Sequence, residues 1–259
     1  MQTEMCSVKL IRSLLLLIFL FTVRTHLFAQ GSLLIAPRRV VFEAGRKVQE
    51  VNVANNGRDT MRYIVQLQDM QMLNDGQFRI IPGDSAKVQS TSIIKFYPKH
   101  LVLAPGEAQI VKLQLINRSG GKLPEGEYRC HLVIRPVATQ AIPKIRKMVT
   151  HIKLRLKPAF SFTIPVIVRL GASDTRVAIS DISFPLDTVP RLLFALKRTG
   201  NMSAYGDIHV FFEQSGRSTS VGSLLGLSVY YPNVEREFTI ALARKGVNYR
   251  NGKFHIIYT

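Results

Sequence analysis

Apolar and polar residues alternate with a period of two along most of the chain after residue 30. The alternation is clearest in three groups of residues: Val51 and Val53; Tyr63, Val65 and Leu67; and Val111, Leu113 and Leu115. Similar runs recur at 190–197, 205–212 and 253–258. A period of two is typical of a β-strand with one buried face. No long stretch carries the 3.6-residue period of a helix, so the pattern predicts an all-β protein.

Turn-forming residues separate these runs. They are Asn56-Gly57, Asn74-Asp75-Gly76, Pro82-Gly83-Asp84, Pro105-Gly106, Gly120-Gly121 and Asn251-Gly252. Short strands at roughly 8–12-residue spacing are typical of immunoglobulin-like sandwiches. The chain has 259 residues, which is enough for two such domains. A long strand-like run ends near Arg169, so we expect the domains to span 31–169 and 170–259.

One run is much longer than an ordinary sandwich strand, which has about 5–6 residues. It covers residues 148–169, and its apolar residues lie at even positions: Ile152, Leu154, Leu156, Phe160, Phe162 and Ile164. Pro158 and Pro165 interrupt it, and proline is tolerated at sheet edges or bulges. Because proteins normally avoid exposed apolar edge strands, this segment is expected to lend a strand to another protein. The alternatives are a strand shared between two sheets, or two strands with a turn at Lys157-Pro158.

The first 30 residues have the pattern of an export signal. Lys9 and Arg12 precede an apolar stretch of 11 residues, Ser13 to Val23, which is shorter than the roughly 20 residues of a spanning helix. A cleavage point follows near Ala29. No later run approaches a membrane span, so we expect an exported chain with no integral membrane segment.

The composition is strongly basic, with 35 Lys and Arg against 17 Asp and Glu, a formal charge of +18. The cations mostly alternate with apolar residues along strands, which indicates either a solvated face or a surface that attracts an acidic protein partner. Nucleic acid is not an expected partner, because the chain is exported. Removal of the signal takes Cys6 with it and leaves Cys130 alone, which is expected to be a small core residue.

No motif of catalysis or metal binding stands out. The chain lacks the patterns GxSxG, GxxxxGK[ST], HExxH and CxxC. Its histidines after the signal are scattered, with no acid or cysteine at metal-ligand spacing. We therefore expect a binding protein, not an enzyme, with no cofactor and no metal.

Several motifs of the first predicted domain resemble the periplasmic pilus-assembly chaperones of the chaperone–usher pathway, in their archaic branch. They are Ala36 to Phe42 (APRRVVF), Tyr97-Pro98 with Leu103 to Glu107 (LAPGE), Leu123 to Arg129 (LPEGEYR) and Ile164 to Arg169 (IPVIVR). The second domain carries only a weak tag, Arg198 to Asn201 (RTGN). The resemblance implies two immunoglobulin-like domains in an L-shaped arrangement.

The resemblance also implies donor-strand complementation, a form of strand addition. The partners would be pilin or fimbrial subunits, each an incomplete sandwich, and an outer-membrane usher that receives them. The even-numbered apolar residues of 148–168 would fill the groove of the subunit. Four or five such side chains contribute about 1.5–3 kcal/mol each, so they would set the affinity. A cationic anchor would set the register of the bound strand.

The family's anchor is a pair of cations that hold the terminal carboxylate of the subunit. Arg39 matches the first of them. Alignment on Lys153-Leu154 gives Lys153 as the second, whereas the preferred alignment on Ile164 to Arg169 puts Pro165 there. Lys95 and Lys99 are alternative contacts. Arg169 resembles the family's interdomain arginine, with Glu127 as its partner.

The sequence therefore predicts a periplasmic chaperone that caps fimbrial subunits. The alternative is a two-domain immunoglobulin-like envelope protein that uses its edge strand for assembly or adhesion. The two differ in ligand, because a chaperone needs a partner that lacks a strand.

Overall fold

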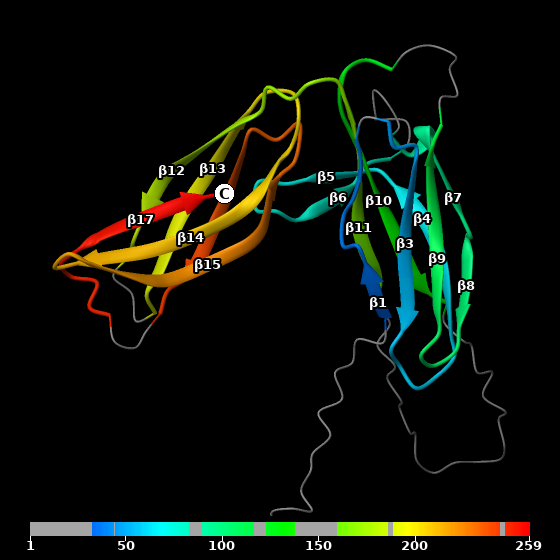
Figure 1. The fold of residues 1–259 in the computed structure, drawn as a ribbon, viewed down its shortest axis with the longest axis horizontal. Helices are drawn as coiled ribbons and strands as arrows, with labels where there is room; N and C mark the ends of the chain where they lie inside the picture. Colours follow the sequence, from blue (N-terminus) through cyan, green and yellow to red (C-terminus); the bar gives the residue numbers. More distant parts are fainter. Residues whose placement is uncertain are drawn as a thin grey trace, which may run out of the picture.

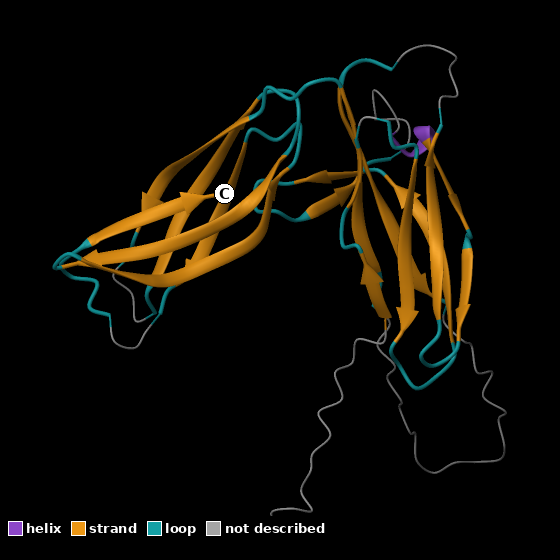
Figure 2. Cartoon of the chain, in the orientation of Figure 1, coloured by secondary structure: helices purple, strands orange, loops and turns teal. Residues whose placement is uncertain are grey.

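The computed structural model describes residues 33–43, 45–82, 90–116, 123–137, 160–185, 189–243 and 247–259. Figures 1 and 2 show two groups of strands that lie as the arms of an angle and are joined at one end. The first group contains β1 to β11 and the second β12 to β17. Strand β11 ends at Leu170 and β12 begins at Arg176. The predicted fold class, two immunoglobulin-like β-sandwiches, is confirmed.

The first sandwich packs two sheets face to face. One sheet has the order β1 (Leu33–Ala36), β3 (Val48–Asn55), β9 (Ala108–Leu115) and β7 (Ile94–Tyr97). The other has the order β2 (Val40–Phe42), β11 (Phe162–Leu170), β10 (Gly126–Pro136), β4 (Met61–Gln68) and β8 (His100–Leu103). A 3-10 turn, η2 (Ser90–Ile93), precedes β7.

The alternating residues of these strands form the first core. Val51, Val53, Val111 and Leu113 are completely buried between the sheets. Cys130 is buried in the same core, as the sequence predicted, and burial raises the pKa of its thiol. A thiol in this state is unreactive.

Strand β11 is an edge strand over only part of its length. Val166–Val168 lies between β10 and the parallel strand β2, whereas Phe162–Pro165 pairs with β10 alone. Pro158 and Pro165 predicted a strand at the edge of a sheet, and this prediction was wrong at Val166–Val168. The sequence showed the two prolines but not β2. Pro165 pairs with β10 alone, and no described strand lies on its other side to need the missing N–H.

A two-stranded hairpin projects from the first sandwich toward the second, as Figure 1 shows. It consists of β5 (Met70–Met72) and β6 (Phe78–Ile80). Phe78 covers His131 on the outer face of β10, with ring centroids 4.8 Å apart. Strand β10 is consequently buried on both faces near its middle.

The second sandwich is smaller. One sheet has the order β12 (Arg176–Ser183), β13 (Arg191–Thr199) and β16 (Glu235–Ala241). The other has the order β15 (Arg217–Val229), β14 (Ala204–Gln214) and β17 (Lys253–Tyr258). Leu192, Ile208, Val210 and Val229 are completely buried between them.

The predicted export signal, residues 1–30, lies outside the described residues. Within the described ranges, no helix is long and apolar enough to cross a membrane.

Asn55 is the buried polar residue on which one end of the first sandwich depends. Its Nδ2 donates to the carbonyl oxygens of Asp59 (2.8 Å) and Leu103 (2.9 Å), and its Oδ1 accepts from Gly57 N–H (2.9 Å). Asn55→Ala should lower the free energy of unfolding by about 2 kcal/mol, because these bonds are lost in a dry site. Urea denaturation checks this. The matched control is Asn52→Ala, an exposed position on the same strand, which should change the stability by less than about 0.5 kcal/mol.

Candidate binding site between the two domains

A buried carboxylate joins the two sandwiches. The side chain of Glu127, on β10, is only 1% exposed, and its Oε2 accepts from Arg169 Nε at 3.2 Å. The same oxygen accepts from the Ser203 backbone N–H at 2.9 Å, and Oε1 accepts from the Ser203 hydroxyl. Arg169 Nη2 also donates to the Ser203 carbonyl oxygen at 3.0 Å. The predicted pairing of Arg169 with Glu127 is confirmed, and it extends across the domain junction to Ser203.

An apolar contact supports this junction. Met72 of the hairpin, Ile167 of β11 and Tyr230 of the second domain form a separate buried cluster. Each such side chain contributes about 1.5–3 kcal/mol when it leaves water. The partner of a buried charge mainly offsets the cost of burial. The apolar cluster therefore holds the domains together, and the Glu127 network fixes their orientation.

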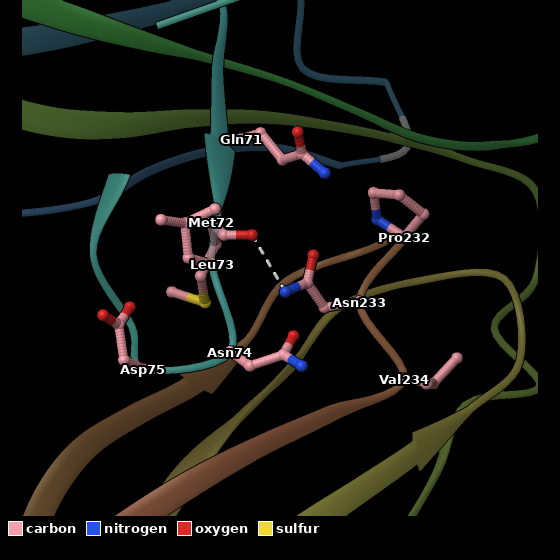
Figure 3. Close-up of a pocket in the computed structure, with 8 residues that line it drawn as sticks. All are labelled: Gln71, Met72, Leu73, Asn74, Asp75, Pro232, Asn233 and Val234. Carbon is pink, nitrogen blue, oxygen red and sulfur yellow. Dashed lines mark hydrogen bonds between the residues drawn. The ribbon is translucent and has the colours of Figure 1, made fainter. Parts of the chain in front are cut away.

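The hairpin docks on the turn that follows Tyr230. Asn233 Nδ2 donates to the Met72 carbonyl oxygen at 2.9 Å, the dashed line in Figure 3. The Glu237 backbone N–H donates to the Asn74 carbonyl oxygen at 3.3 Å. An open pocket of about 690 Å³ lies beside this contact, lined by residues 71–75 and 232–234. Its lining has one ionisable side chain, Asp75, so it offers no acid–base pair for catalysis.

Arginines gather around the junction and stack on tyrosines. The Arg129 guanidinium lies 4.2 Å from the ring centroid of Tyr230, and that of Arg198 lies 5.4 Å from Tyr231. Arg198 is buried and donates to the carbonyl oxygens of Gly200 (2.8 Å) and Met202 (2.9 Å). These two cations are thus held by aromatic faces and backbone oxygens.

Arg39 lies at the same junction. Its guanidinium lies 4.1 Å from the ring centroid of Tyr205, a residue of the second domain. Burial lowers the pKa of Arg39, and the nearby Arg169 lowers it as well. Its Nε is buried without a hydrogen-bond partner among the described residues. A half-buried cation with an unused donor favours an anion as its ligand.

The predicted donor residues fall into three groups. Ile152, Leu154, Leu156 and the anchor candidate Lys153 lie outside the described residues. Phe160 is 56% exposed just before β11. Phe162 packs on the rim of the first core, and Ile164 is buried within it.

The alternative contacts, Lys95 and Lys99, are exposed on β7 and on the turn after it. Strand β7 is the edge of its sheet opposite β1, so the structure does not bring these lysines to the domain junction. Sequence reasoning missed Arg129, Tyr205, Tyr230 and the docking role of the β5–β6 hairpin. The adjacent Tyr230-Tyr231 pair was the available signal, because buried tyrosines often accompany arginines at interfaces.

In the part of the chain that the structure describes, no three His, Cys, Asp or Glu side chains are grouped so as to hold a metal ion. The junction offers arginines, aromatic faces and one carboxylate that is paired with Arg169.

Comparisons with known proteins give similar folds and nothing more. No family model matches the sequence, and no curated protein matches it. The crystal structure of the YadV chaperone is 12% identical over 88% of this chain and 92% of that one, with a TM-score of 0.47. The CupB2 chaperone of Pseudomonas aeruginosa is 14% identical over 87% and 99%, with a TM-score of 0.46. The CsuC–CsuE chaperone–tip adhesion subunit complex from the archaic chaperone–usher Csu pili of Acinetobacter baumannii is 15% identical over 80% of this chain and 90% of that one, with a TM-score of 0.43. These likenesses are too distant to support an argument about function.

His131 makes the stability of the first domain depend on pH. It is buried, and neither ring nitrogen has a hydrogen-bond partner among the described residues. Burial, with a smaller effect of Arg129, lowers the pKa of His131 to about 3. The folded state therefore keeps the ring neutral, while the unfolded state takes up a proton below pH ~6.5. The free energy of unfolding is therefore highest above pH ~6.5 and decreases as the pH falls toward 3.

Between pH 7 and pH 5 the wild type should lose about 2 kcal/mol more unfolding free energy than His131→Phe, which keeps a ring against Phe78 but does not titrate. Urea denaturation at both pH values measures the difference. Equal losses for the two proteins would show that His131 is solvated in the folded state.

Proposed function

We propose that this chain is a periplasmic chaperone that binds incomplete fimbrial subunits by donor-strand complementation and delivers them to an outer-membrane usher. The proposal includes export by the N-terminal signal and a mature chain of two domains, 31–169 and 170–259. It describes a binding protein without catalytic activity or cofactor.

The observation that carries the proposal is the position of Phe160. This large apolar side chain is 56% exposed where the chain enters the part of β11 that pairs with β10 alone. Ile152, Leu154 and Leu156 precede it at even positions. A segment of this pattern, continuous with a strand whose edge is open, suits strand addition to a partner. Phe162 and Ile164 would fix the base of the donor strand in its own sandwich.

Arg39, at the domain junction, supports the same proposal. It makes no ion pair with a described residue, and its Nε is unsatisfied. The C-terminal carboxylate of a subunit would supply both the charge and the acceptor. Because an anchor of this kind acts at one point, it would fix the register of the bound strand. Lys153 is the second candidate for this role.

Phe160→Asp should abolish capture of the subunit and leave the free protein folded, because a charge cannot enter an apolar groove. The measurement is purification of a tagged chain from periplasm of cells that express the neighbouring genes, with mass spectrometry of the copurifying proteins. The control is Ser161→Asp, the exposed next position, which should still capture. A small β-protein recovered equally with both variants would contradict the donor-strand assignment. If the wild-type chain is recovered without any partner, the result would favour the alternative, a two-domain immunoglobulin-like envelope protein.

Arg39→Ala should weaken subunit binding by at least about tenfold, because one charge-assisted hydrogen-bond contact contributes about 1.5–3 kcal/mol and about 1.4 kcal/mol corresponds to a factor of ten. Titration of the copurified subunit by calorimetry measures this. Arg38→Ala is the matched control, since Arg38 is the exposed neighbour and should bind as the wild type does. Identical affinities for the two variants would remove Arg39 from the site.

A further inference from the structure

The outer face of β10 buries a histidine that lacks a polar partner among the described residues. His131 is 2% exposed, although the first core lies on the opposite face of its strand. Neither of its ring nitrogens is hydrogen-bonded to a described residue. Phe78 of the β5–β6 hairpin meets the ring edge-on. The hairpin is therefore part of what keeps His131 out of water.

The same hairpin makes much of the contact between the domains. The ring centroid of Phe78 lies 6.0 Å from that of Tyr230 in the second domain. Met72, which pairs with Phe78 in the hairpin, is buried against Tyr230 and accepts a hydrogen bond from Asn233 (Figure 3). Because one face of the hairpin contacts both His131 and Tyr230, it cannot leave the histidine without disturbing the contact with the second domain.

The hairpin has little stability of its own. Strands β5 and β6 have three residues each and pair with each other as a separate two-stranded sheet. An isolated two-stranded hairpin is marginally stable in water. Phe78 is also 43% exposed, and Ile80 of the same strand is 55% exposed. An element of this kind is expected to open locally while the sandwich stays folded.

The sheet around His131 offers no charge that could balance a protonated ring. The neighbouring strands β4 and β11 contain no acid. Their cations are Arg62, at the far end of β4, and Arg169, which is paired with Glu127 of β10. Arg129 lies two residues from His131 on the same face of β10. Its positive charge opposes protonation of the ring.

The hairpin and the second domain bring no counter-charge either. The two carboxylates of the hairpin, Asp69 at its base and Asp75 at its tip, each accept a hydrogen bond within the first domain. The cation of the hairpin is Arg79, which donates to Gln71 at 3.0 Å. From the second domain, Tyr230 approaches through its aromatic ring. A proton on the histidine would therefore be buried without compensation.

Docking of the hairpin and protonation of His131 consequently oppose each other. With the hairpin docked, burial and, to a smaller extent, Arg129 lower the pKa of His131 to about 3. With the hairpin lifted, water reaches the ring and its pKa returns to about 6.5. The docked state is thus most favoured above pH ~6.5 and becomes less favoured as the pH falls toward 3.

We propose that the β5–β6 hairpin is an acid-sensitive latch on the domain junction. Acid favours the hairpin lifted from His131, and the second domain then loses the apolar part of its contact with the first. The bonds between Glu127 and Ser203 do not involve the hairpin, so the domains stay joined at a less defined angle. This inference does not require the proposed function.

Residue-resolved hydrogen exchange of the full chain, at pH 7.5 and pH 5, tests the latch. Division by the intrinsic exchange rates at each pH gives the opening constants. Those of the hairpin amides, residues 69–81, should rise about 30-fold at pH 5, because the pKa of the histidine moves between about 3 and about 6.5. His131→Phe should remove the rise, and His100→Phe, an exposed histidine of the same sandwich, should keep it. Equal constants at both pH values in the wild type would overturn the proposal.

The core strand β9 shows whether the opening is local. At each pH the hairpin amides should have larger opening constants than the amides near Val111, which is completely buried. Identical constants for the hairpin and β9 would mean that the hairpin is released only when the whole sandwich unfolds. The hairpin would then not be a latch.

Glu237 reports on the second domain in the same experiment. Its backbone N–H donates to the carbonyl oxygen of Asn74 in the hairpin, so its opening constant should rise together with that of the hairpin. The amide of Phe238, the next residue, is turned toward β13 by the alternation of the ladder and should not follow. Rapid exchange of Glu237 at both pH values would mean that the hairpin is not docked on the second domain. A constant that ignores the opening of the hairpin would mean that the two are not coupled. Either result would overturn the proposal.

Discussion

A β-sandwich excludes water only where a strand closes the seam between its two sheets, and this constraint governs the whole molecule. In the first sandwich β11 closes the seam by placing Val166 and Val168 over the core. The same strand carries Ile167 and Arg169 to the domain junction. Its open half begins beside the exposed Phe160. One strand thus completes a core, orients the second domain and leads into the segment proposed to bind a partner.

The junction combines apolar contact with a small number of buried charges. The cluster around Tyr230 provides most of the attraction, because three apolar side chains leave water there. Glu127 is buried with a full set of donors, so its charge is tolerated and its directional bonds define one relative orientation. Arg39 differs from the other arginines of the junction in having neither a carboxylate nor a carbonyl oxygen as partner among the described residues.

Much of this architecture follows from residue patterns. Period two located the strands around Val51, Tyr63 and Val111, and the same alternation placed Cys130 in the core. The pairing of Arg169 with Glu127 came from a family resemblance. Patterns could not show that β2 pairs with Val166–Val168 of β11, since a three-residue parallel strand has no distinctive period. The docking of the hairpin on Asn233 could not be predicted either, because it depends on the backbone carbonyl oxygen of Met72, which is 161 residues away in the sequence.

The most direct measurement is hydrogen exchange across residues 150–161, with and without the copurified subunit. Strand addition pairs the donor backbone with the partner, so amides between Ile152 and Phe160 should exchange much more slowly in the complex. The amides of β11 near Val166 should remain protected in both states, because β10 and β2 already pair with them. Unchanged exchange before Phe160 in a stable complex would contradict the account, since the partner would then be bound through another surface.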